Sequence, residues 1–127
     1  MIAFAEREFA LSIPDKDGVT YRQALQSLID RHLRRGDKPE RIAELQAELA
    51  QPPLPQSLEY LWAAFCRLAT RRTSNGYGPN LITYPEIDAF QRVTGIRLDP
   101  WEVEIIEMLD RMFITENAKS QGNGGDE

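Results

Sequence analysis

The 127-residue sequence has only one cysteine, Cys66, and one histidine, His32. A single cysteine excludes an internal disulfide, and Cys66 lies among apolar residues, where a small buried side chain fits. One cysteine and one histidine far apart in the chain also leave little material for a zinc site or a Cys/His nucleophile pair. We therefore expect a protein of a reducing, cytosolic compartment without a bound metal.

Long apolar runs are also missing. No window approaches the roughly 18 consecutive apolar residues that a membrane span needs. The first ten residues carry Glu6, Arg7 and Glu8, where a signal peptide would need an apolar core. The sequence therefore predicts neither export nor insertion into a membrane.

Excess positive charge is the third absence. The chain has 15 basic and 20 acidic residues, a net charge of −5 that repels a phosphate backbone. From Thr73 onward there are 4 basic and 10 acidic residues, a net of −6, which leaves about +1 for the first 72 residues. This division predicts two unlike surfaces, which suit protein partners better than nucleic acid.

Capping signals predict an all-α, mainly helical fold of about five helices in a small bundle. Thr20 can cap a first helix, which Gly36 ends, and Gly95 ends a later one. Three capping boxes, in which an N-cap residue and a glutamate three residues on bond each other's backbone, are indicated at Asp37/Glu40, Thr83/Glu86 and Asp99/Glu102. Pro39, Pro85 and Pro100 stand in the first turns that tolerate proline.

The segment before Pro14 is ambiguous. Phe9, Leu11 and Ile13 alternate with smaller or polar residues, which favours a short strand. The Ala-, Glu- and Arg-rich residues before them are equally compatible with a helix.

Proline and glycine punctuation divides the chain. Residues 51–55 hold three of the eight prolines and predict a joint between an N-terminal helical segment, 1–50, and a C-terminal helical domain, 56–117. Residues 118–127 are glycine-rich and polar, so we expect a flexible tail.

Two apolar stripes indicate the core of the C-terminal part. The densest runs through Leu58, Leu61, Trp62, Phe65 and Leu68, and a second through Trp101, Ile105, Leu109, Met112 and Phe113. Glu104, Glu107 and Asp110 are expected on the other side of the last helix, either as a solvated face or as a site for a basic partner.

Motifs for catalysis are lacking. The glycine-rich loop at 75–80 has no following Gly-Lys-Ser/Thr, and nothing supports an acid/base or metal pair of Asp88 with Asp110. Arg71 and Arg72 complement a helix C-terminus or bind an acidic partner. We expect no enzyme activity, no catalytic residue and no cofactor.

The second half of the chain carries a spaced pattern of aromatic, Gly-Pro and Trp-Glu elements. Its segments are Leu58-Glu59-Tyr60-Leu61-Trp62, Gly76-Tyr77-Gly78-Pro79-Asn80, Glu86-Ile87-Asp88-Ala89-Phe90 and Pro100-Trp101-Glu102-Val103-Glu104. Over about half the chain, this pattern resembles the tail assembly chaperones of long-tailed phages and prophages.

The resemblance implies a non-enzymatic role in the host cytoplasm. Such a protein would bind the tape measure protein, keep its long apolar helices soluble and help to recruit tail tube subunits; homo-oligomer formation stays open. The candidate partner contacts are Tyr77, Tyr84, Arg71, Arg72, Trp62 and Trp101. The alternative for Trp62, Phe90 and Trp101 is that they build the core.

Two other functions remain open on the sequence. A small phage- or prophage-encoded adaptor or inhibitor of a host protein would use the same kind of surface. A helical DNA-binding regulator is disfavoured, because the helix that would read the bases starts with Asp99 and Glu102.

Overall fold

The computed structural model describes residues 1–122, and over that range the chain is helical with no strand. The elements are α1 (Ile2–Ser12), α2 (Tyr21–Arg35), α3 (Pro39–Leu49), the short 3-10 helix η1 (Gln56–Leu58), α4 (Glu59–Ala69), α5 (Tyr84–Thr94) and α6 (Pro100–Gly122). The all-α prediction is confirmed. No helix within these residues is both long enough and apolar enough to cross a membrane.

The strand alternative for the N-terminal segment is wrong, because residues 2–12 form helix α1. Phe9 and Ile13 are buried in one apolar cluster, whereas Leu11 is buried in another. The alternation that favoured a strand therefore arises from a helix end that is covered on two sides.

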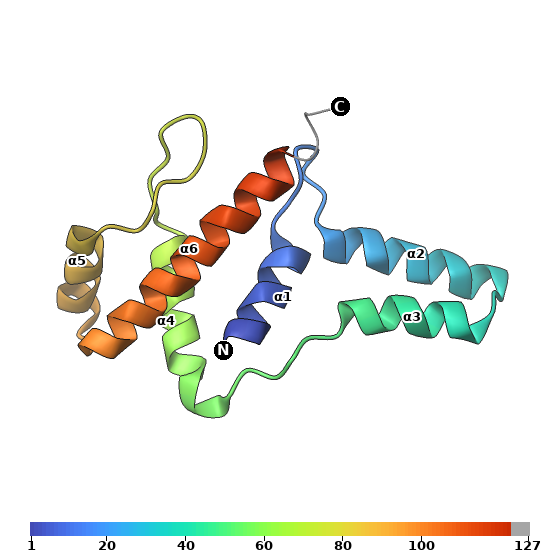
Figure 1. Ribbon diagram of the computed structural model, residues 1–127, viewed down its shortest axis with the longest axis horizontal. Coiled ribbons are helices and arrows are strands. Elements are labelled where there is room, and N and C mark those ends of the chain that lie inside the picture. The colour runs from blue at the N-terminus through green and yellow to red at the C-terminus, as the bar shows by residue number, and fades with distance from the viewer. Residues whose placement is uncertain (123–127) are drawn as a thin grey trace.

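The larger cluster joins α1, α4, α5 and α6. Figure 1 shows α6 crossing α4, with α1 alongside and α5 at the end of the molecule. Its fully or nearly buried members are Ala5, Phe9, Ile13, Leu61, Phe65, Leu68, Ile87, Ile106 and Leu109. The stripe predicted on α4 is thus the centre of this core.

The smaller cluster holds the α2–α3 pair, which extends to the side of the molecule opposite α5 (Figure 1). It consists of Leu11, Leu25, Ile29 and Leu45. The Oε1 atom of Glu8 on α1 accepts a hydrogen bond from Arg22 at 2.9 Å and another from Gln51 at 2.8 Å. These contacts fasten α2 and the first residue of the proline-rich segment 51–55 to α1, and the domain division at that segment stays a prediction.

Helix caps confirm several predicted boundaries. Thr20 caps α2 in a box with Gln23, and Thr83 caps α5 in a box with Glu86. Gly36 and Gly95 end α2 and α5 in the left-handed conformation, with φ of 72° and 76°.

The capping box predicted at Asp37 is wrong. The N-cap of α3 is Lys38, and its side chain makes no capping bond. Asp37 instead lies 2.6 Å from the Nδ1 atom of His32, at the end of α2. The Asp37 carboxylate therefore contacts a side chain of α2 and does not cap α3.

Helix α6 continues beyond residue 117, where we expected it to end. The side chains of Ser120 and Gln121 both donate to the carbonyl oxygen of Pro14, each at 3.3 Å. Residues 118–122 of the expected tail are thus helical, and its last five residues lie outside the described range.

Candidate partner-binding surface

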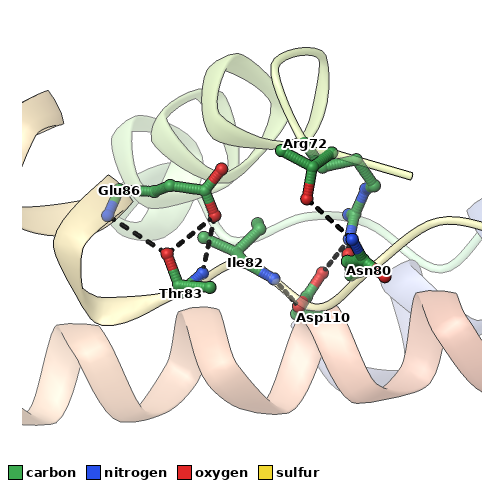
Figure 2. A network of polar contacts seen from close by, with 7 residues as sticks. Arg72, Asn80, Ile82, Thr83, Glu86 and Asp110 are labelled. Atoms are coloured by element: carbon green, nitrogen blue, oxygen red, sulfur yellow. Dashed lines mark hydrogen bonds and ion pairs between the residues drawn. The ribbon is translucent and has the colours of Figure 1, made fainter. Parts of the chain in front are cut away.

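A buried ion pair anchors the loop between α4 and α5 (Figure 2). The Nη1 atom of Arg72 lies 2.7 Å from the Oδ1 atom of Asp110, and the two side chains are only 8% and 3% exposed. The same Nη1 atom donates to the carbonyl oxygen of Asn80 at 3.0 Å, and the Oδ2 atom of Asp110 accepts from the backbone N–H of Ile82 at 2.7 Å. The guanidinium also lies 4.4 Å from the ring centroid of Phe113. Both ends of the loop are therefore fixed to α6.

The ion pair leaves two of its buried polar atoms without a hydrogen bond to any described residue. The approach of Arg72 to Asp110 is close enough for a strong charge interaction, yet Oδ1 of Asp110 and Nη2 of Arg72 have no well-aligned hydrogen-bond partner among residues 1–122. Charge attraction in a poorly solvated environment, rather than hydrogen-bond geometry, is the main contribution of this contact.

Internal hydrogen bonds close the loop at 73–80. The Oδ1 atom of Asn75 accepts from the backbone N–H groups of Tyr77 at 2.9 Å and Gly78 at 3.1 Å, and Ser74 donates to the carbonyl oxygen of Gly78 at 2.9 Å. Gly76 has a φ of 91°, which favours glycine there. The result is a closed turn that presents Tyr77 with its side chain 100% exposed.

Two more of the predicted aromatic contacts are exposed. Tyr84 is 67% exposed at the start of α5, and Trp101 is 49% exposed at the start of α6. The hydroxyl of Tyr84 donates to Glu107 of α6 at 2.5 Å, and this hydrogen bond to a carboxylate raises the pKa of Tyr84 above its ordinary value. Tyr84 is thereby held against α6.

The other three predicted contacts differ in exposure. Arg71 is exposed at the end of α4, whereas Arg72 is buried in the ion pair with Asp110. Trp62 is partly buried and packs edge-on against Phe4, with ring centroids 5.0 Å apart. The structure therefore places Tyr77, Tyr84, Trp101 and Arg71 on the surface, and turns Trp62 and Arg72 inward.

The core-facing side of α6 holds Leu109, with Ile105, Met112 and Phe113 packed against the core as predicted, but it extends further than expected. Asp110 was expected on the solvated side, but it is 2% exposed, and Glu102 is buried as well. Each carboxylate has partners that compensate for burial: Glu102 accepts from the backbone N–H of Asp99 at 2.6 Å and from the hydroxyl of Tyr60. Trp101, assigned to the apolar stripe, is half exposed instead.

The sequence held one signal of this arrangement. Asp110 directly follows Leu109 and lies four residues after Ile106, so it falls among the buried residues of the helix. A buried carboxylate needs a cation as its partner. Nothing in the sequence identified Arg72, 38 positions earlier, as that cation.

Chemically reactive groups are dispersed over the described residues. Asp88 is paired with Arg92 at 3.3 Å on the outside of α5, whereas Asp110 is buried against Arg72. Within residues 1–122 no three His, Cys, Asp or Glu side chains are placed to hold a metal ion. Burial raises the pKa of the Cys66 thiol.

The fold and this surface define a small all-helical protein that exposes aromatic side chains on an anchored loop and at the starts of two helices. The chain belongs to the phage tail assembly chaperone family, whose family model matches residues 32–115. The matched range runs from the end of α2 through most of α6 and includes the whole α4–α5 loop. Membership in this family points to a non-enzymatic role in tail assembly, with phage tail proteins as partners. No curated protein and no solved structure matches the chain.

Proposed function

We propose that this protein binds the tape measure protein in the cytoplasm of the infected cell, keeps its apolar helices soluble and helps to recruit tail tube subunits. Membership in the tail assembly chaperone family supports the tail proteins as partners. A binding protein of this kind needs large adaptable contact surfaces rather than a reactive group.

The observation that carries the proposal is the set of exposed aromatic side chains Tyr77, Tyr84 and Trp101. Exposed tyrosine and tryptophan contribute large contact areas at a low entropic cost, and they are enriched where binding energy is concentrated. The tie between Arg72 and Asp110 holds the Tyr77 loop, and the hydrogen bond to Glu107 holds Tyr84. The backbone that carries Tyr77 and the side chain of Tyr84 are therefore held in place before a partner arrives.

Co-expression tests the proposal. The tape measure protein encoded in the same genome is produced alone and together with this chain, and its soluble fraction and co-purification are measured. We expect a soluble complex only when both chains are present. A tape measure protein that stays equally insoluble, with no complex recovered, would contradict the proposal.

Replacement of Tyr77 by alanine tests the aromatic contacts separately from folding. Because Tyr77 is fully exposed, Tyr77→Ala should change the free energy of unfolding by less than about 0.5 kcal/mol. Recovery of the tape measure complex should fall, whereas the control Leu33→Ala, an exposed residue on α2, should leave it unchanged. Equal recovery with Tyr77→Ala would remove this loop from the contact surface.

A further inference from the structure

A groove follows one side of α6. One hollow of about 450 Å³ lies at its start, between Trp101 and Arg111, and a second of about 300 Å³ lies between α6 and α1, reaching Lys119. The two hollows share Met108 and Arg111 and therefore form one surface, which we call the α6 groove. Figure 1 shows α1 beside α6. At 1.5 Å per residue, Trp101 to Lys119 extends over about 27 Å.

The floor of the groove is apolar and partly exposed. It is formed by Trp101, Ile105, Met108 and Met112, which recur at the spacing of one helix face beside the fully buried Leu109. Ile105 and Met112 also pack against the core, whereas Trp101 is 49% exposed. Helix α6 thus carries a partly exposed apolar stripe along the edge of its buried face. Methionine adapts its shape to different partners, which suits a surface that receives a segment of another protein.

The rim of the groove is acidic. It carries four glutamates, Glu6, Glu104, Glu107 and Glu116, against two cations, Arg111 and Lys119. Lys119 is already near Glu116, at 4.0 Å, and Glu6 and Glu104 have no ion pair within the described part of the chain. An apolar floor with a net charge of −2 at its edges fits a segment whose apolar stripe is bordered by basic residues.

We propose that the α6 groove binds a helical segment of the tape measure protein in which apolar residues at three- and four-residue spacing are flanked by lysine or arginine. The inference rests on the proposed function and adds the docking surface and the charge of the segment. A helix is the matching shape because the floor is itself straight and helical, and one amphipathic helix packs its apolar face along another.

Charge reversal on the rim tests the inference. The variant Glu6→Lys with Glu104→Lys changes one exposed glutamate in each of the two hollows and should lower the recovery of the co-expressed tape measure complex at least about fivefold. The matched control, Glu40→Lys with Glu44→Lys on α3, changes the net charge equally and should retain wild-type recovery. Arg111→Glu should retain or raise recovery, because it removes a cation that repels the basic segment.

Removal of apolar surface tests the floor. Met108→Ser should lower recovery at least about fivefold, whereas Val93→Ser, an exposed apolar residue on α5, should have no effect. Circular dichroism and thermal unfolding of each variant alone identify any loss that comes from misfolding.

The outcomes separate the two proposals. A wild-type chain that recovers no complex overturns the proposed function and this inference with it. Wild-type recovery that is unchanged in the groove variants overturns the groove alone. A loss with Arg111→Glu as large as that with the double glutamate variant shows that the partner segment is acidic, which also overturns the inference.

Discussion

At the scale of single residues, the contact between Arg72 and Asp110 has the largest structural consequence. Both side chains are almost fully buried, and together they bind the two ends of the α4–α5 loop to α6. Taking two charges out of water is costly, so each partner is tolerated only because the other is present. The pair therefore acts as a positional constraint whose loss leaves an uncompensated buried charge.

Replacement of Asp110 by alanine should reveal this constraint. Without the carboxylate, the buried guanidinium of Arg72 loses its counter-charge and the backbone N–H of Ile82 loses its acceptor, so the free energy of unfolding should fall by about 3–5 kcal/mol. Urea unfolding measures the change. The control Asp88→Ala breaks an exposed pair with Arg92 and should cost less than about 1 kcal/mol. Equal losses in the two variants would show that the Arg72 pair is dispensable.

The thiol of Cys66 provides a pH-dependent measurement at the same scale. Burial, and to a smaller extent the charge of Glu8, raises the pKa of Cys66 above its ordinary value. Because the thiolate is the reactive form, a raised pKa means less thiolate at any pH below it. Modification by a thiol reagent should therefore need a higher pH in the folded protein than in the protein unfolded in urea. Identical pH profiles would contradict the assigned burial.

At the scale of helices, the cap of α5 orients the surface that carries Tyr84. The Oγ1 atom of Thr83 accepts from the backbone N–H of Glu86, and the Glu86 carboxylate accepts from the backbone N–H of Thr83 at 2.8 Å. Figure 2 shows this capping box near the ion pair of Arg72 and Asp110. The capping box at Thr83 and the loop contact at Ile82 are thus adjacent, at the start of α5.

Removal of this cap should destabilise the protein moderately. Thr83→Ala leaves backbone donors at the start of α5 without a partner, and the free energy of unfolding should fall by about 1 kcal/mol in denaturant melts. Thr115→Ala, at an exposed position on α6, makes the same chemical change away from a cap and should have a smaller effect. A Thr83 variant as stable as the Thr115 variant would argue against the box.

Helix caps were predictable because their signal is local. The residues that bond at Thr20, Thr83, Gly36 and Gly95 lie within a few positions of one another, so spacing alone indicates the boundary. The capping box predicted at Asp37 was wrong because this residue lies between the ends of two helices. Its carboxylate contacts His32 of α2 at 2.6 Å.

Non-local packing was not predictable in the same way. The alternation at the end of α1 indicates a strand until one knows that Phe9 and Leu11 face different clusters. On α6 the predicted apolar stripe lies in or against the core except for Trp101. The burial of Asp110 was missed because it depends on Arg72, a partner far away in the sequence. The exposure of the candidate contacts was also not predictable. By sequence both Tyr77 and Arg72 are compatible with a surface position, yet of these two only Tyr77 is exposed.

At the scale of the whole molecule, α1 joins two apolar clusters of unequal size. The α2–α3 pair is held by four buried side chains, whereas the α4–α6 part contains most of the core. The net charge is divided as well, with −6 from Thr73 onward and about +1 before it. The acidic part carries the exposed side chains of Tyr77, Tyr84 and Trp101 and most of the α6 groove, so partner binding is expected there.

The methionines permit a direct test of the central claim that this chain binds the tape measure protein in the α6 groove. The sequence has three, of which Met108 and Met112 line the α6 groove and Met1 packs against the core. NMR spectra of isotope-labelled methionine methyl groups are recorded with and without the co-purified tape measure protein. We predict that the Met108 signal shifts on complex formation while the Met1 signal moves little. A Met108 signal that does not change when the tape measure protein is present would contradict the account.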